Sequence, residues 1–301
     1  MFITLTTDFG ASSPYVAAMK GVILSINPEA RLVDVSHVVP PQQVLAGAQV
    51  LDDTTRYFPT GTIHVAVIDP GVGTSRKIVY AEIGAQRYVC PDNGLLSRLS
   101  ERESPSTITE VTNSQSFRES VSSTSHGRDF VAPDNGLLSR LAISTPPSTI
   151  ITVAEPQYWL PAVSATFHGR DIMAPVAAHL SLGIDPKVLG PPLAELRTLD
   201  WPGVEKLANR IEGEIVAIDS FGNLVTNITR DMLSDVPTDE SVAVRCDGHE
   251  THSIFSAYAE QPSMTLIALV GSNDQLELAI VDDSAKIMLG VGVGAKVEVC
   301  W

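Results

Sequence analysis

The sequence has few cysteines, few basic residues and no long apolar run. Its three cysteines, Cys90, Cys246 and Cys300, are widely spaced, which fits reduced packing thiols better than a disulfide framework or a zinc knuckle. No apolar stretch approaches the roughly 18 to 20 residues that span a bilayer. Met1 leads directly into a predicted strand, without the basic and apolar regions of a secretory signal. We therefore expect a cytoplasmic protein without a membrane segment.

Charge excludes another class of partner. The chain has 20 Lys and Arg residues against 35 Asp and Glu, a formal net charge of −15. Nucleic acids are bound through basic faces, so this balance argues against a nucleic-acid partner.

Hydrophobic patterning divides the 301 residues into two predicted domains. Over residues 1–190, short apolar runs alternate with helical spacing, which predicts an α/β domain with a mainly parallel sheet. Residues 191–207 are rich in Pro and Gly and are expected to form a linker. Residues 208–301 carry short strands separated by turns, which predicts a smaller antiparallel barrel or sandwich. Its expected strands are residues 214–218, 224–228, 241–246, 253–257, 265–270, 276–280 and 295–301.

Two acidic residues follow predicted strands in the first domain. Asp69 comes directly after the β-branched run Thr62–Ile68, and Asp8 follows the first strand at residues 2–6. Ligands of open α/β sheets bind at the carboxyl ends of the strands, so both carboxylates are candidates for one site. Arg76 lies close enough along the loop to fold back toward Asp69. The alternative is a turn carboxylate that caps backbone amides beside a solvated arginine.

A tandem duplication interrupts the first domain. Residues 91–99 recur as 133–141, 105–108 as 147–150, and 126–129 as 168–171, with every pair offset by 42 residues. One duplication, about 91–129 and 133–171, explains all three matches, and two copies are too few for a solenoid. The second copy is more apolar, so we expect residues 100–132 to form an exposed or mobile insertion. His168, which leads directly into a predicted helix at 174–182, is favoured over His126.

Several familiar motifs are incomplete. Gly71-Val72-Gly73-Thr74 is not followed by the Lys-Ser/Thr of a phosphate-binding loop, and there is no Gly-x-Ser-x-Gly elbow. The His-Gly-Arg-Asp segments offer no recognised metal-ligand spacing, so no metal site is predicted. Taken alone, Asp219–Asn223 and Gly271–Asp274 are more typical of turns than of sites.

Taken together, these segments resemble one family. The motifs that carry the resemblance are Thr6-Thr7-Asp8-Phe9-Gly10, Asp69-Pro70-Gly71-Val72-Gly73-Thr74 with Arg76, Pro-Asp-Asn-Gly-Leu-Leu, Thr166–Asp171, Asp219–Asn223, and Gly271-Ser272-Asn273 with Glu277. In this order they resemble the S-adenosyl-L-methionine hydroxide adenosyltransferase family, whose relatives include fluorinating and chlorinating enzymes. The resemblance covers nearly the whole chain. It implies an α/β domain, a C-terminal β-barrel, and homotrimers whose sites lie between one subunit's N-domain and its neighbour's C-domain.

The resemblance also implies a reaction. S-adenosyl-L-methionine carries a sulfonium, so methionine leaves ribose C5′ as a neutral thioether when water attacks in line, and no cofactor is needed. Asp69, Arg76 and His168 match the residues that position and polarise this water, with His168 orienting the water or accepting its proton. Asp8 matches the residue that holds the ribose hydroxyls. The remaining matched positions surround the nucleoside and the methionine portion, and they are Phe167, Asp219, Phe221, Asn223, Ser272 and Glu277.

Two alternatives to hydrolysis stay open. The halogenating relatives have Tyr where Asp69 stands and lack the pair His168-Gly169, and a carboxylate would repel an incoming halide, which favours water over halide. The duplicated segment could instead have spoiled the site, leaving a nucleoside-binding protein without activity.

Overall fold

The structure is a computed structural model that describes residues 1–102, 120–125, 128–133 and 149–301. The chain separates into two compact units, Met1–Leu199 and Asp200–Trp301. The first unit therefore extends through part of the segment expected as a linker. Leu199 is tied to it by a backbone N–H that donates to Ser97 Oγ at 3.3 Å.

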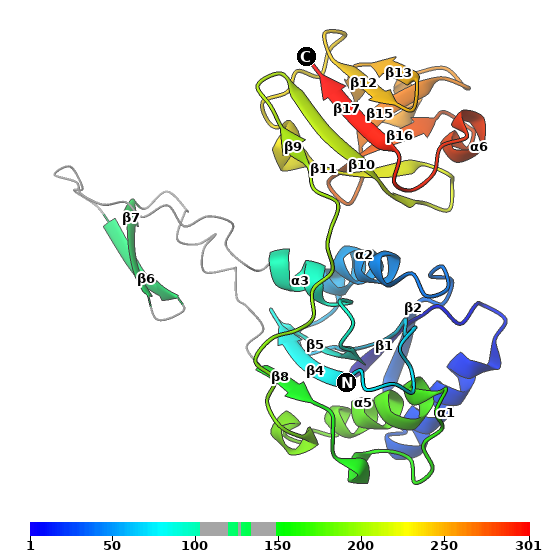
Figure 1. Cartoon of the computed structure of the whole chain (residues 1–301), viewed down its shortest axis with the longest axis vertical. Coiled ribbons are helices and arrows are strands. Elements are labelled where there is room, and N and C mark those ends of the chain that lie inside the picture. The colour runs from blue at the N-terminus through cyan, green and yellow to red at the C-terminus, as the bar shows by residue number, and fades with distance from the viewer. Residues whose placement is uncertain (103–119, 126–127, 134–148) are drawn as a thin grey trace. The chain divides into compact units, whose positions relative to one another are not determined.

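The first unit is built on a six-stranded sheet with the order β2-β1-β3-β5-β4-β8 (Figure 1). Strands β2, β1, β3 and β5 run parallel, and only β4 runs against the others. Its elements are β1 (Phe2–Thr7), α1 (Pro14–Ile26), β2 (Arg31–Ser36), α2 (Val44–Thr54), η1 (Thr55–Tyr57), β3 (Ile63–Val67), β4 (Ile78–Ile83), β5 (Gln86–Pro91), α3 (Ser97–Arg102), β6 (Ser120–Ser125), β7 (Arg128–Pro133), β8 (Thr149–Thr152), η2 (Pro156–Tyr158), η3 (Gly169–Met173), α5 (Ala174–Ser181) and η4 (Pro186–Leu189). The predicted α/β domain with a mainly parallel sheet is confirmed.

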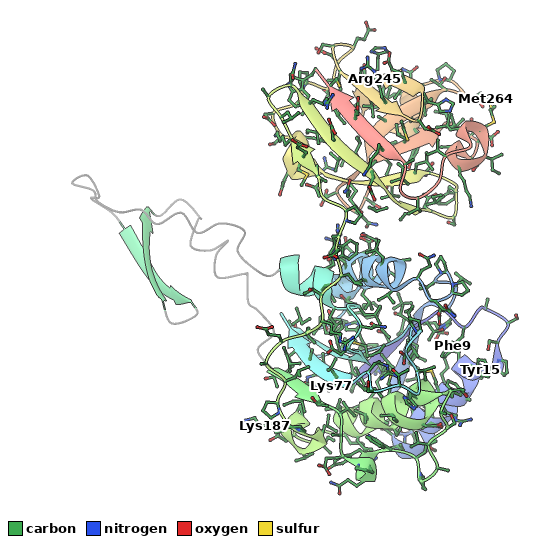
Figure 2. The ribbon with its side chains drawn as sticks, in the orientation of Figure 1. Phe9, Tyr15, Lys77, Lys187, Arg245 and Met264 are labelled. Carbon is green, nitrogen blue, oxygen red and sulfur yellow. The ribbon has the colours of Figure 1, made fainter. Side chains whose placement is uncertain are left out.

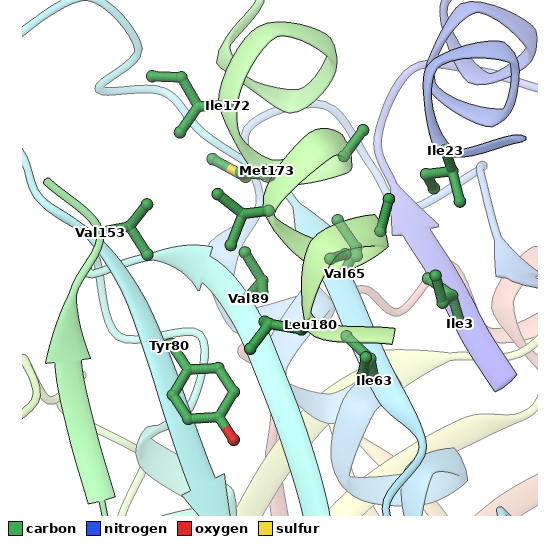
Figure 3. Packing of buried hydrophobic residues seen from close by; sticks show 14 of the residues in the cluster. Ile3, Ile23, Ile63, Val65, Tyr80, Val89, Val153, Ile172, Met173 and Leu180 are labelled. Atoms are coloured by element: carbon green, nitrogen blue, oxygen red, sulfur yellow. The ribbon is translucent and has the colours of Figure 1, made fainter. Parts of the chain in front are cut away.

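Helices cover both faces of this sheet, which is why β3 is buried at every residue. On one face, α1 packs Met19 and Ile23 into a core with Met173 and Leu180 of η3 and α5 (Figure 3). Helix α1 begins where Ser13 accepts a hydrogen bond from the Tyr15 N–H. On the other face, α2 and α3 cover a second core (Figure 1).

Both copies of the duplicated segment contribute elements to the first unit. The first copy supplies the end of β5 and all of α3, and the second copy supplies β8 and the start of η3. The same motif therefore has two conformations, because Arg128-Asp129 lies in β7 whereas Arg170-Asp171 lies in the π-helical turn η3. His126 lies outside the described residues, as does most of the expected insertion at 100–132.

The second unit is a nine-stranded antiparallel sheet that curls into a nearly closed barrel, as predicted. Closure is visible where Thr251 Oγ1 of β13 donates to the Leu266 carbonyl of β15 at 2.8 Å. Its elements are β9 (Glu205–Lys206), β10 (Arg210–Ile218), β11 (Leu224–Thr229), η5 (Arg230–Leu233), β12 (Ala243–Cys246), β13 (His249–His252), β14 (Ile254–Phe255), η6 (Tyr258–Glu260), β15 (Leu266–Val270), β16 (Gln275–Ile280), α6 (Ala285–Leu289) and β17 (Lys296–Cys300). The short pair β14 and β15 is the one parallel pairing among its described strands.

Candidate functional site

Two predicted site residues lie at the carboxyl edge of the first sheet, each just after one of two neighbouring strands. Strands β1 and β3 are parallel and pair Thr7 with Val67, so Asp8 and Asp69 both follow the ends of adjacent strands. The Asn93 side chain donates to the Ile68 carbonyl at 2.9 Å and fixes the chain just before Asp69. The repeated Pro-Asp-Asn-Gly motif of the first copy thus supports the candidate site.

Asp69 and Arg76 form a buried bidentate ion pair. Arg76 Nε donates to Asp69 Oδ1 at 2.8 Å, and Arg76 Nη2 donates to the other carboxylate oxygen, Oδ2. The two side chains are only 4% and 6% exposed, so water screens this pair little. The expected fold-back of Arg76 toward Asp69 is what the structure shows.

His168 joins this pair from a distant part of the chain. Arg76 Nη2 lies 3.3 Å from His168 Nδ1. A guanidinium can only donate, so Nδ1 must be the unprotonated nitrogen and the neutral ring carries its hydrogen on Nε2. Burial lowers the pKa of His168 below its ordinary value of 6.5, and the Arg76 charge lowers it further, against the opposing charges of Asp69 and Asp171. The neutral ring is therefore favoured beside Arg76.

Two close approaches hold the His168 segment against the sheet. Gly73 has a φ of +77°, and a Cβ there would lie 2.4 Å from the Ala165 carbonyl oxygen, so only glycine fits. A Cβ on Gly169 would lie 3.1 Å from Val67 of β3. Asp171, fully buried, accepts a hydrogen bond from the Ser164 N–H at 2.8 Å and closes the loop that carries His168.

An aromatic cluster lies beside His168 and Asp8. Phe167 packs edge-on against Phe9 and Tyr15, with ring centroids 5.6 Å and 5.0 Å apart, and the centroids of Phe9 and Tyr15 are 5.7 Å apart. Figure 2 labels Phe9 and Tyr15. Arg170 covers the Phe167 ring at 4.9 Å from its centroid. The sequence identified Phe167 but did not single out Phe9 and Tyr15, because rings that meet from distant parts of the chain leave no local pattern.

The predicted residues of the second unit line one pocket of about 710 Å³, within the usual size range of small-molecule sites. Asp219, Phe221, Asn223, Ser272 and Glu277 all line it. Phe221 is 77% exposed at its rim, whereas Asn223 and Glu277 are buried.

Asp219 shapes this pocket by holding its turn. Its Oδ1 accepts hydrogen bonds from the N–H groups of Phe221 and Asn223 at 2.9 and 2.8 Å, and its Oδ2 accepts from Asn223 Nδ2 at 2.9 Å. Gly222, with a φ of +88°, sits so close to Ser284 that no side chain fits there. The structure therefore confirms the turn interpretation of this segment, and its role as a binding site stays a prediction.

Tyr258 is a pocket residue that sequence reasoning missed. Its hydroxyl accepts from Asn223 Nδ2 and donates to Glu277 Oε2, both at 3.3 Å. Burial, followed by the charge of Glu277, raises the pKa of Tyr258 to about 12, so it remains a donor at neutral pH. It stands on the short turn η6, where no periodicity marks it.

Some classes of site find no support in the described part of the chain. Residues 1–102, 120–125, 128–133 and 149–301 contain no group of three or more His, Cys, Asp or Glu side chains placed to hold a metal ion. Within the same residues, no helix has the length and apolar character to cross a membrane.

The two units and their side chains define a class: an α/β sheet with a buried Asp-Arg-His network at its carboxyl edge, joined to a β-barrel that carries a polar-lined pocket. Comparison with known proteins makes the class specific. The family model described as the SAM hydroxide adenosyltransferase N-terminal domain matches residues 3–133 and 130–190, and the model of the C-terminal domain matches residues 213–298. The chain belongs to the SAM hydroxide adenosyltransferase family.

Individual relatives agree with this assignment. The chain is 32% identical to an (R)-S-adenosyl-L-methionine hydrolase of Salinispora arenicola, covering 99% of this chain and 97% of the relative. It is 33% identical to the protein of that name from Thermus thermophilus, covering 97% and 96%. A fluorinase of an Actinoplanes species is 29% identical over 42% of this chain and 50% of its own.

A solved structure agrees as well. The crystal structure of an uncharacterized conserved protein from Thermotoga maritima superposes with a TM-score of 0.80 at 31% identity, covering all of both chains. The fold of this chain is therefore similar to that of the Thermotoga maritima protein over its whole length.

Proposed function

We propose that the protein hydrolyses S-adenosyl-L-methionine to adenosine and L-methionine. The observation that carries the proposal is the network of Asp69, Arg76 and His168 at the carboxyl edge of the sheet. Full-length relatives named (R)-S-adenosyl-L-methionine hydrolase support the same reaction. Their name points to the (R) configuration at the sulfonium as the preferred substrate.

The proposed step is an in-line displacement. Water oxygen forms a bond to ribose C5′ while the C5′–S bond breaks, and the sulfur keeps the bonding pair, so methionine leaves as a neutral thioether. The water then loses a proton to solvent. Removing bulk water and holding one molecule behind C5′ replaces a random encounter with an oriented one.

The geometry favours particular roles in the network. Arg76 donates to both oxygens of Asp69, and the remaining lone pairs of this carboxylate can accept a hydrogen bond from water. His168 presents Nε2–H when Nδ1 faces Arg76. Of the two roles expected for His168, orienting the water is therefore favoured over accepting its proton.

The rest of the substrate needs both polar and apolar partners. Asp8 would hold the ribose hydroxyls beside the ring of Phe167. In the second unit, the pocket offers an exposed aromatic ring at Phe221 and buried polar groups at Asn223 and Glu277. Such a lining suits a nucleobase or the amino-acid end of the substrate.

Product analysis tests the reaction directly. Purified protein is incubated with (R)- and (S)-S-adenosyl-L-methionine in ¹⁸O-water, with and without chloride. Adenosine carrying ¹⁸O at its 5′ oxygen supports the proposal. The appearance of 5′-chloroadenosine would favour the halogenase alternative, and binding without turnover would favour a nucleoside-binding protein.

Variants locate the reaction. His168→Ala should abolish turnover, whereas His179→Ala, on α5 outside the network, should not. His126→Ala is the matched test of the duplicated copy, and loss of turnover in that variant alone would move the assignment to His126.

We further propose a homotrimer in which each site combines the first unit of one subunit with the second unit of its neighbour. Analytical ultracentrifugation tests the trimer. Mixing inactive Asp69→Asn subunits with inactive Asn223→Ala subunits tests the sharing. After random exchange, about one quarter of the sites would hold two intact halves and regain activity. Sites contained within single subunits would stay inactive in the mixture.

A further inference from the structure

A second histidine network lies next to Asp8 and takes no part in the proposed chemistry. His37 follows β2, and its side chain is only 13% exposed. Its Nδ1 lies 3.0 Å from the hydroxyl of Thr7, the fully buried last residue of β1. Its Nε2 lies 3.0 Å from Asp34 Oδ1.

The hydrogen bonds in this network have a consistent direction. Thr7 Oγ1 accepts from the Phe9 N–H at 3.3 Å, so its own hydrogen is free to be donated to His37 Nδ1. With Nδ1 as the acceptor, the ring hydrogen lies on Nε2, 3.0 Å from Asp34 Oδ1. Asp34 is in turn anchored by Lys20 Nζ at 2.5 Å.

The backbone around His37 also contacts the Asp8 segment. The Gly10 N–H donates to the His37 carbonyl at 2.7 Å. The Gln42 N–H donates to Asp8 Oδ2 at 2.8 Å, and Gln42 has a φ of +65°, which an L-residue seldom adopts. The loop that begins at His37 therefore makes hydrogen bonds to the Asp8 segment at Thr7, Asp8 and Gly10.

We propose that His37 is a positioning residue for ribose recognition, acting through Thr7 to fix the direction of the Asp8 carboxylate. This inference rests on the proposed function, in which Asp8 holds the ribose hydroxyls. Asp8 has one oxygen bound to Gln42, which leaves the other available for a diol only if the strand end stays in place. Without the imidazole, the Thr7 hydroxyl loses its acceptor and the strand end loses a side-chain tether.

The test compares two ligands that differ only at the groups Asp8 would bind. Affinities of adenosine and 2′,3′-dideoxyadenosine are measured by calorimetry on the full-length protein. His37→Ala should weaken the binding of adenosine about three- to tenfold, equivalent to one lost hydrogen bond, and leave the affinity for dideoxyadenosine nearly unchanged. Thr7→Val should show the same pattern, and His37→Asn, which keeps an acceptor, should recover part of the loss.

Controls separate this inference from the proposed function. His252→Ala, an exposed histidine of the second unit, should change neither affinity. Asp8→Asn should remove the preference for adenosine, and His37→Ala added to it should have no further effect. If Asp8→Asn keeps the preference, the ribose role of Asp8 is wrong. If Asp8→Asn loses it but His37→Ala and Thr7→Val weaken both ligands equally, or neither, the positioning role of His37 is wrong.

Discussion

The buried ion pair makes a quantitative prediction. Replacing Arg76 with Met keeps an unbranched apolar stem but removes both donors to Asp69 and the donor to His168. It leaves a carboxylate that is 4% exposed without its cation. Breaking a buried pair in this way costs about 3 to 5 kcal/mol of unfolding free energy. For a unit of this size, we expect the melting temperature to fall by about 6 to 20 °C.

A double-mutant cycle separates the pair from the packing. The double variant Asp69→Asn with Arg76→Met lacks both charges of the pair, so it should be at least about 2 kcal/mol more stable than the sum of the two single changes predicts. The control is Arg87→Met in the same unit. Its partner Glu82 lies 3.9 Å away and both side chains are about one-third exposed, so the loss should stay below about 1 kcal/mol.

Thermal and urea unfolding measure these quantities, with adenosine release measured in parallel. If Arg76→Met costs less than about 1 kcal/mol, the pair is not desolvated as described. If the effects of the two changes simply add, Asp69 and Arg76 are not coupled, and the network loses its physical basis.

Three further predictions concern other parts of the site. Because burial and Arg76 lower the pKa of His168 below 6.5, kcat/KM should stay level above pH 6.5 and fall as the pH drops through that lowered pKa. As the pH falls, the unfolded state binds this proton before the folded state does, so His168 also lowers the free energy of unfolding at acid pH. Gly73→Ala should destabilise more than Gly61→Ala, measured by urea unfolding, since both have φ near +78° but only Gly73 faces a carbonyl oxygen. Tyr258→Phe should raise KM about three- to tenfold with little change in kcat, because it removes one hydrogen-bonding group from the pocket.

Much of the fold could be predicted because the order of apolar and polar residues along the chain indicates which residues are buried. The run Ile63–Val67 is apolar at almost every position, which suits a strand covered on both faces, and the structure buries it completely. The strand His249–His252 was missed for the opposite reason. It is a polar edge strand with a single buried residue, Thr251, so it shows no alternation to detect.

The candidate site could be predicted in part for a similar reason. Asp69 and Arg76 are close in sequence, and a strand end followed by a tight turn brings them together. Tyr258 acts through one hydroxyl at the end of a short turn, and contacts of that kind depend on tertiary packing. The spacing of the motifs does not separate the two copies, because residues 91–99 and 133–141 are identical, and only the helix predicted directly after His168 favoured it over His126.

The mixed use of the two copies has a genetic consequence. Since residues 91–99 and 133–141 are the same nine residues, recombination between them would excise 42 codons and join the halves that the folded unit already employs, with no foreign residue at the junction. The remaining polypeptide would run from β5 through the start of α3 toward β8 in its original order. The expansion can therefore be removed without changing the residues on either side of it, and its loss would leave Asp69, Arg76 and His168 in place.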